Sequence, residues 1–185
     1  MSSLRQLIGA DLKRYRGRAS FKDGVIAYLR VSGFRFMFWH RIAHRCRSNK
    51  ALYLFPWLVL SRLKYKYGYD IPAETHIEPG FYIGHFGGIV VSPLAKIGRN
   101  CNISQGVTIG FNPRGKRQGY PVLGNEVYIA PGAKIIGRVT IGNNVAIGAN
   151  AVVLDDLPDN SVAAGNPARV VSTNGAAGYI INKAD

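Results

Sequence analysis

The sequence predicts a mainly β protein, a parallel β-helix of hexapeptide repeats preceded by an α-helical segment. The first observation is an aliphatic residue at every sixth position across most of the second half of this 185-residue chain. A period of six fits neither an amphipathic helix nor a simple strand, and a short fixed period is typical of repeat architectures. The thirteen repeated positions, eleven of them isoleucine, are Ile71, Ile77, Ile83, Ile89, Ile97, Ile103, Ile109, Leu123, Ile129, Ile135, Ile141, Ile147 and Val153.

The second observation is the composition of each six-residue unit. The residue after the repeated position is often small, as in Gly84, Gly98 and Gly110, and small residues suit a tight corner. Each unit therefore makes one short strand and one corner, and three units close a triangular coil. Coils stack by strand pairing at roughly 4.8 Å, so the repeated side chains bury on one another and no single coil is stable alone.

The third observation is that residues 1–69 follow a helical pattern instead. Ser3 and Ser20 are suitable N-caps, and glycines punctuate the ends of the expected helices. Pro56 is tolerated only in the first turn of a helix, so the last helix is expected to begin near Phe55. The expected helices cover about residues 3–15, 20–31, 34–47 and 55–67.

The repeat defines a β-helix domain over residues 70–172, followed by a weakly specified C-terminal tail over residues 173–185. The register breaks twice. A step of eight residues near Ser92 and Pro93 is a small bulge, and a step of fourteen implies an excursion loop over residues 111–122. Loops that leave a rigid scaffold commonly carry function, so this loop is a candidate part of a site.

Charge is distributed unevenly along the chain. Residues 1–70 hold 15 Lys/Arg against 3 Asp/Glu, a net +12, whereas residues 71–185 hold 9 against 7, a net +2. The strongly basic charge of residues 1–70 favours anionic partners. Interleaved aromatic residues suit peripheral contact between residues 1–69 and a membrane, although a packed aromatic core with solvated charges is the alternative. No recognised motif accompanies the charge, so no nucleic-acid partner is expected.

The remaining composition favours a cytoplasmic protein. Two cysteines, Cys46 and Cys101, imply no disulfide framework and fit a reducing cytosol. Arg5 and Asp11 interrupt any signal-peptide pattern in the first residues. The longest apolar run, residues 51–60, is too short to cross a bilayer.

Five segments of the chain resemble the hexapeptide-repeat acyltransferases, and within them the serine acetyltransferase-like branch. The segments are residues 33–34, 40–44 (HRIAH), 84–91 (GHFGGIVV), 105–110 (QGVTIG) and 163–169 (AAGNPAR). The resemblance covers nearly the whole chain. It implies a left-handed β-helix, a homotrimer with active sites between subunits, and transfer of an acetyl group from acetyl-CoA to a hydroxyl.

The resemblance also implies the catalytic pair. His85 matches the general base of serine acetyltransferases, and Asp70, fifteen residues earlier, matches its carboxylate partner. The chemistry agrees, because a carboxylate bonded to one imidazole nitrogen fixes the tautomer that lets the other nitrogen accept a proton from a hydroxyl. The alternative is that His85 is only a polar corner residue of the coil and that Asp70 only forms a turn.

The donor side is implied in the same way. Gly110, Pro131 and Ala149 match small residues that line the pantetheine channel, and Arg169 matches a basic residue near the phosphates of CoA. The alternative for Gly110 and Ala149 is that they are small only because the corners of the coil need small residues, and not because they line a channel. No metal site is expected, because only His76 and His85 lie in the coils and zinc would need more ligands.

The acceptor side departs from the serine enzymes. The positions at which those enzymes carry charges for a free amino acid are occupied here by Gly84, by Gly119 and Tyr120, and by Arg18. The chain also resembles O-acetyltransferases of exopolysaccharide and capsule synthesis. Together with the departure, this resemblance predicts that the acceptor is a sugar or polysaccharide precursor and that Tyr120 stacks on the sugar. The alternatives are a serine acetyltransferase of cysteine biosynthesis and a non-catalytic scaffold at a membrane.

Overall fold

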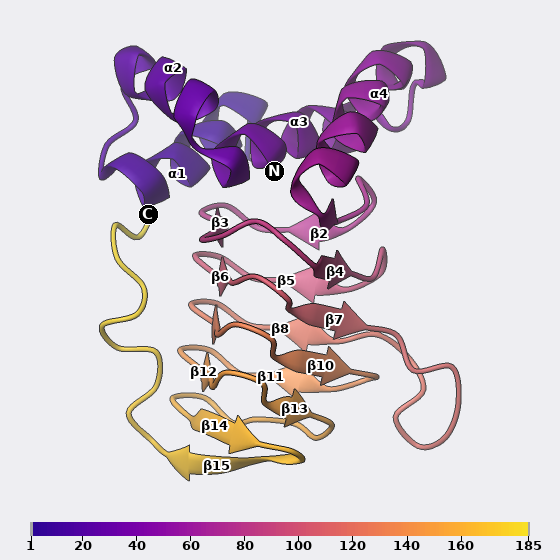
Figure 1. Cartoon of the computed structure of the whole chain (residues 1–185), viewed down its shortest axis with the longest axis vertical. Helices are drawn as coiled ribbons and strands as arrows, with labels where there is room; N and C mark the ends of the chain where they lie inside the picture. The colour runs from indigo at the N-terminus through magenta and orange to yellow at the C-terminus, as the bar shows by residue number, and fades with distance from the viewer. Residues whose placement is uncertain (1, 185) are drawn as a thin grey trace.

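Four helices cap one end of a stack of short strands in the computed structural model, which describes residues 2–184 (Figure 1). The helices are α1 (Leu4–Arg16), α2 (Phe21–Arg30), α3 (Ser32–Cys46) and α4 (Lys50–Tyr67). The predicted start of the last helix is wrong: α4 begins at Lys50, and Pro56 lies inside it. The reason is Asn49, whose side-chain oxygen accepts hydrogen bonds from the backbone N–H groups of Ala51 and Leu52 and so caps the helix.

The strands form three parallel sheets that are the faces of a triangular prism, a left-handed parallel β-helix as predicted. The first face contains β1 (Tyr69–Asp70), β4 (Ile89–Val91), β7 (Thr108–Gly110), β10 (Lys134–Ile136) and β13 (Val152–Val153). The second contains β2 (His76–Ile77), β5 (Lys96–Ile97), β8 (Val122–Leu123) and β11 (Thr140–Ile141). The third contains β3 (Tyr82–Ile83), β6 (Asn102–Ile103), β9 (Tyr128–Ile129), β12 (Ala146–Ile147), β14 (Val162–Gly165) and the antiparallel β15 (Ala168–Ser172).

The repeated aliphatic residues fill the prism. All thirteen are buried, with at most 5% of any of them exposed. Strand pairing stacks them in register, so that Ile83 lies beside Ile103 and Ile103 beside Ile129. Burial of each such side chain contributes about 1.5–3 kcal/mol relative to exposure, which explains how strands of two or three residues persist.

A buried ion pair fixes the helical cap to the first coil. The guanidinium of Arg41 donates to both carboxylate oxygens of Asp11 at 2.9 and 3.0 Å. The same carboxylate accepts hydrogen bonds from the backbone N–H groups of Gly80 and Phe81 at 3.0 and 2.9 Å. Because both charged groups are almost completely buried and fully bonded, the helices and the coil form one packed unit.

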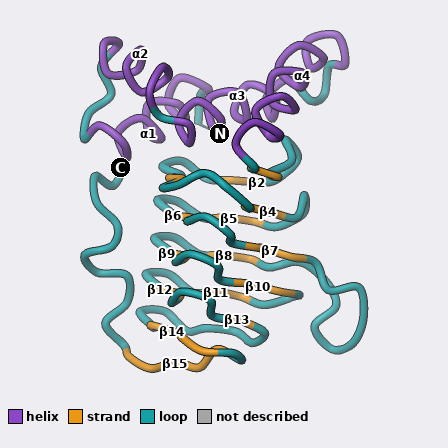
Figure 2. Tube along the Cα trace, viewed as in Figure 1, coloured by secondary structure: helices purple, strands orange, loops and turns teal. Residues whose placement is uncertain are grey.

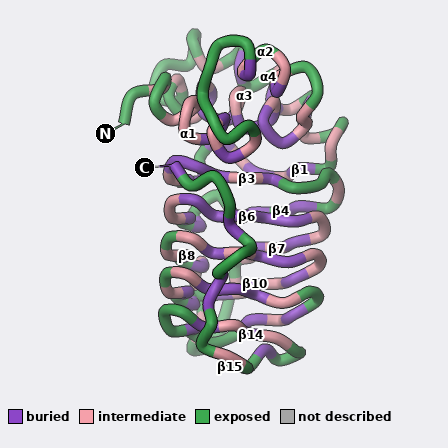
Figure 3. The backbone as a smooth tube through the Cα atoms, turned by 90° about the vertical axis from the view of Figure 1, so that its left-hand side faces the viewer, coloured by how far each residue is buried: buried purple, intermediate pink, exposed green. Residues whose placement is uncertain are grey.

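The C-terminal segment is more firmly held than the sequence indicates. Its described part, residues 173–184, runs back along the third face of the prism toward α1 (Figure 3). Tyr179 stacks on Tyr128 with ring centroids 4.5 Å apart, and Asn100 exchanges two hydrogen bonds of 2.9 Å with the backbone of Ala184. The expectation of a weakly specified tail is therefore wrong, because polar corner residues of the coil bind it.

Candidate active site

His85 heads a column of side chains along one edge of the prism, where the third face turns into the first. The column continues through Gln105, Pro131 and Ala149, because each lies two residues after a repeated isoleucine of the third face and those isoleucines are paired in register. Backbone hydrogen bonds of 2.9 Å from Gly132 to Gln105 and from Asn150 to Pro131 hold the lower coils together. The column thus aligns the predicted base with two of the predicted cofactor residues.

The loop that carries His85 is fixed at the end of α4. The backbone N–H of Gly87 donates to the carbonyl oxygen of Tyr67 at 2.9 Å, and the backbone N–H of Ile89 donates to the carbonyl oxygen of Gly68 at 3.0 Å. Gly87 and Gly88 have φ angles of 107° and 63°, which residues with a side chain rarely adopt. The fixed loop leaves His85 exposed to solvent, where a substrate can reach its imidazole.

Asp70 lies on β1, and its carboxylate has a partner other than His85. Its Oδ1 lies 2.7 Å from the Nζ of Lys64 in the last turn of α4, with the two side chains 44% and 40% exposed. No hydrogen bond or ion pair between Asp70 and His85 is found among the described residues. Both side chains of the predicted pair are therefore accessible, and the carboxylate is held by a lysine.

A pocket of about 280 Å³ opens beside this ion pair, between α4 and the chain that follows β1. Lys64 and Asp70 both line it, and Glu74 adds a second carboxylate. Aromatic walls come from Tyr53, Trp57 and Tyr65. A small cavity with one cation and two carboxylates has the charges that a zwitterionic ligand needs.

The remaining predicted donor residues are spread over two parts of the coil. Pro131 and Ala149 stack in the column, whereas Gly110 ends β7 on the first face. A Cβ atom on Gly110 would lie 2.8 Å from Cδ1 of Ile136, the end of a side chain that can move aside, so packing alone does not require glycine there. Arg169 lies on β15, and its guanidinium is 3.7 Å from Asp155.

The excursion loop projects from the prism after β7 (Figure 2), and Arg117 ties it to the lower coils. Arg117 donates two hydrogen bonds of 3.1 and 2.9 Å to Asp156 and contacts Asp155 at 3.4 Å. The backbone N–H of Thr140 and the guanidinium of Arg117 lower the pKa of Asp156. Within the loop, the ring of Tyr120 stacks on Phe111 at 4.6 Å.

Sequence reasoning missed Gln105, which lies one coil below His85. Its side-chain oxygen is buried, and within residues 2–184 that oxygen has no hydrogen-bond partner. A buried carbonyl without a donor costs free energy, so such an atom is a candidate to bind a ligand. The resemblance did include Gln105, in the segment QGVTIG, but gave it no role.

The histidines of the helical cap are packing residues. His40 bonds to the carbonyl of Pro72 at 3.0 Å, and His44 bonds to that of Ala73 at 2.7 Å. Burial lowers the pKa of His40 to about 3, so its imidazole is neutral. In the described part of the chain, no three His, Cys, Asp or Glu residues lie close enough together to hold a metal ion.

Comparisons with known proteins agree on one family. Residues 120–155 match the family described as bacterial transferase hexapeptide (six repeats). The serine acetyltransferase of Bacillus pumilus is 36% identical over 156 residues, which are 84% of this chain and 70% of that protein. That of Helicobacter pylori (strain ATCC 700392 / 26695) is 36% identical over 141 residues, which are 76% of this chain and 81% of that protein.

Solved structures give the same result. Soybean serine acetyltransferase, as the apoenzyme, superposes with a TM-score of 0.79 at 34% identity, covering 91% of this chain and 69% of that one. The Brucella abortus serine acetyltransferase in complex with coenzyme A superposes with a TM-score of 0.75 at 31% identity, covering 93% of this chain and 67% of that one.

The prediction of a sugar or polysaccharide acceptor is therefore wrong, and so is the narrower resemblance to exopolysaccharide and capsule enzymes, because the similar proteins are serine acetyltransferases. The prediction rested on charges missing at Gly84, Tyr120 and Arg18. Other charged side chains, Lys64 and Glu74, line a pocket beside Asp70. Spacing in the sequence could not reveal that pocket.

Proposed function

Because the chain belongs to the serine acetyltransferase family of hexapeptide-repeat transferases, we propose that it transfers the acetyl group of acetyl-CoA to the side-chain hydroxyl of serine. The observation that carries this proposal is the identity of 36% with a serine acetyltransferase over 84% of the chain. The donor is acetyl-CoA, in keeping with the relatives solved in complex with coenzyme A.

In the proposed reaction His85 is the general base. One imidazole nitrogen accepts the proton of the serine hydroxyl, and the hydroxyl oxygen attacks the thioester carbonyl carbon of acetyl-CoA. The carbon–sulfur bond of the resulting tetrahedral intermediate then breaks. The CoA thiolate leaves and recovers the proton from the imidazolium, which Asp70 stabilises and orients.

Serine binding would release Asp70 for this task. The carboxylate of serine can replace that of Asp70 as the partner of Lys64, because the existing ion pair is half-exposed and costs little to break. Glu74, in the same pocket, is the proposed partner of the serine ammonium. The ion pair between Lys64 and Asp70 is thus the resting arrangement, and the pair between Asp70 and His85 is the working one.

The donor would run along the column. The pantetheine arm of acetyl-CoA is extended and carries amide N–H groups, and Pro131 and Ala149 leave room for it on successive coils. We infer that the buried oxygen of Gln105 accepts one of these N–H groups just before the thioester reaches His85. Gly110 remains a proposed channel residue, and Arg169 a proposed phosphate ligand that exchanges Asp155 for CoA.

We further propose a homotrimer, in which a neighbouring copy supplies the other wall of the channel. Ala149 and His85 lie on an exposed edge, and a linear donor needs a second surface to exclude water. Apolar side chains exposed on the same prism support such packing, among them Phe86, Val90 and Leu94. Tyr120, at the base of the excursion loop, remains a proposed acceptor contact.

We place the reaction in the cytoplasm, where acetyl-CoA and free serine are both available. The thiols of Cys46 and Cys101 are free, which suits a reducing compartment. Burial raises the pKa of the Cys101 thiol to about 12, so this group stays protonated and unreactive.

Release of free CoA from acetyl-CoA in the presence of L-serine tests the proposal. The purified chain should turn over L-serine, and acetylated serine should appear in the same amount as free thiol. Matched reactions with L-threonine, glycerol and no acceptor define the background. Turnover no faster with L-serine than without acceptor would overturn the proposed function. A simultaneous failure to bind CoA in calorimetry would leave only the scaffold interpretation.

A further inference from the structure

Helix α2 presents an apolar stripe to solvent. Phe21, Val25 and Leu29 follow one another at intervals of four residues and are 90%, 44% and 65% exposed. The opposite side of the helix is packed, since Ala27 is completely buried against Leu12 and Phe34. The stripe therefore plays no part in the core, and such exposure of large side chains marks an interaction surface.

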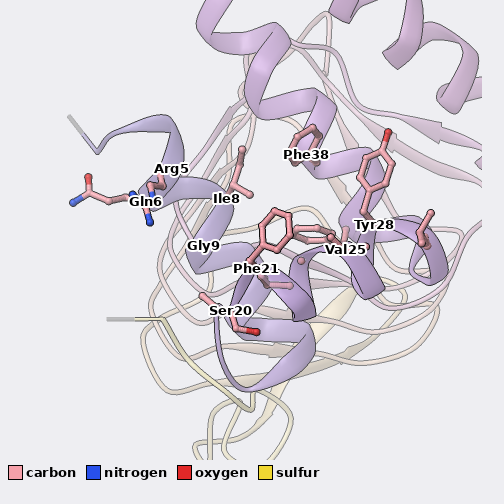
Figure 4. A pocket seen from close by; sticks show the side chains of 14 residues that line it. Arg5, Gln6, Ile8, Gly9, Ser20, Phe21, Val25, Tyr28 and Phe38 are labelled. Atoms are coloured by element: carbon pink, nitrogen blue, oxygen red, sulfur yellow. The ribbon is translucent and has the colours of Figure 1, made fainter.

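An open apolar groove of about 750 Å³ lies beside the stripe, between α1 and α2 (Figure 4). Its floor and walls include Ile8, Tyr28 and Phe38, and the ring of Phe21 lies over its mouth. Arg5, Gln6 and Ser20 are the polar residues at its rim. The stripe and the groove together form one continuous apolar surface on α1 and α2, which we call the α2 face.

Basic side chains border the α2 face. Lys22 and Arg30 are exposed directly beside Phe21 and Leu29, and Arg5 lies on the far rim of the groove. Residues 1–70 contain three acidic side chains, and each already has a basic partner. These pairs are Asp11 with Arg41, Asp23 with Arg16 and Arg18, and Asp70 with Lys64.

We propose that the α2 face docks onto an anionic membrane surface. Phe21, Val25 and Leu29 insert among the acyl chains, while Lys22, Arg30 and Arg5 meet lipid phosphates. An apolar stripe bordered by basic residues is the pattern of helices that lie in the interface. No helix among residues 2–184 is long and apolar enough to cross a bilayer, so the contact is with one leaflet.

Charge favours an anionic membrane over a second copy of the chain as the partner of the α2 face. Two copies that met through their α2 faces would bring Lys22 and Arg30 of one copy toward the same residues of the other. Like charges in contact oppose association, and the net +12 of residues 1–70 in each copy adds to the repulsion. An anionic surface instead neutralises these charges. The proposal goes beyond serine acetylation and does not depend on it.

Co-sedimentation with vesicles tests the proposal on the full chain. The protein should bind vesicles of phosphatidylcholine with phosphatidylglycerol, and not vesicles of phosphatidylcholine alone. Each basic residue near such a surface is worth about 1 kcal/mol, so the Lys22→Ala/Arg30→Ala variant should bind about 30-fold more weakly. Lys116→Ala in the excursion loop is the charge control and should bind like the unsubstituted chain.

Two further variants test the apolar part. Phe21→Ser should weaken vesicle binding severalfold, whereas Phe55→Ser, equally apolar but on α4, should not. In Phe21→Trp, vesicles containing phosphatidylglycerol should shift the tryptophan emission to the blue, a gain of signal that survives any loss of stability. Three results would overturn the proposal: no binding to anionic vesicles, equal loss in Phe55→Ser, or a Phe21→Ser effect confined to self-association in light scattering.

Discussion

The carboxylate of Asp70 lies 2.7 Å from the ammonium of Lys64, and this contact occupies the group that is proposed to orient His85. Exposed ion pairs contribute little to stability, typically 0–1 kcal/mol, so a ligand can exchange the partners at low cost. This ion pair lines a pocket of about 280 Å³. Under the proposed function, acceptor binding would therefore free the carboxylate that orients the catalytic base.

Replacement of Lys64 tests that link. In Lys64→Ala, KM for L-serine should rise about tenfold, because a hydrogen bond to a charged group is worth about 1.5 kcal/mol. KM for acetyl-CoA should stay unchanged, since Lys64 lies outside the column. Lys66→Ala, two residues along the same helix, is the matched control. An equal rise in both KM values would point to a general structural defect and contradict the assignment.

Replacement of Gln105 should leave the stability of the free protein unchanged or slightly higher but weaken the binding of acetyl-CoA. Gln105→Met keeps the shape of the side chain and removes the buried oxygen that lacks a partner. The free protein should therefore be as stable as before or slightly more so, while KM for acetyl-CoA rises about fivefold from loss of ~1 kcal/mol. Thermal unfolding and steady-state kinetics measure the two effects. Gln118→Met in the exposed loop should change neither, and loss of stability without a change in KM would exclude the proposed role.

The ion pair between Asp11 and Arg41 should govern the stability of the whole chain. Asp11→Ala leaves the buried guanidinium of Arg41 without its carboxylate, and such a change costs about 3–5 kcal/mol. Denaturant unfolding measures the loss. Glu126→Ala removes an exposed partner of Lys183 and should cost less than about 1 kcal/mol. Equal effects of the two substitutions would contradict the proposed attachment of the helical cap.

His40 should make the protein less stable in mild acid. Its pKa is lowered to about 3 by burial, below the ordinary 6.5, so the unfolded chain binds a proton at pH values where the folded chain does not. Stability is thus fully present above pH 6.5 and falls as the pH drops toward 3. Between pH 7 and pH 5 the loss from His40 is about 2 kcal/mol.

Unfolding in denaturant at the two pH values checks this dependence. His40→Gln should reduce the difference by about 2 kcal/mol, whereas His76→Gln, at an exposed position, should retain it. Burial also lowers the pKa of His44, which accounts for a remaining dependence of the same sign. A dependence on pH that is unchanged in His40→Gln would mean that another group is responsible.

The sequence predicted the parts of the fold that depend on local pattern. The period of six predicted the prism, because it places every repeated isoleucine on the inner side of the coil. Ser3 and Ser20 cap helices as expected. The C-terminal segment was misjudged because its contacts, such as Asn100 with Ala184, join residues 84 positions apart. No local pattern encodes such contacts.

The site was predictable only where a motif carried it. His85, Pro131 and Ala149 fall into one column because the repeat spaces them. The pair between Lys64 and Asp70 depends on how α4 turns into β1, which composition does not determine. The acceptor was mispredicted because missing charges were taken as evidence for a sugar, whereas the similar proteins are serine acetyltransferases.

The most direct test of the account is kcat/KM for L-serine in the unsubstituted chain and in His85→Ala. Loss of a general base costs typically 10²- to 10⁴-fold, so the variant should fall by at least about a hundredfold while it still binds CoA. His76→Ala, which lies in the same coils, should keep full activity. Serine acetylation by His85→Ala at the rate of the unsubstituted chain would contradict the central claim.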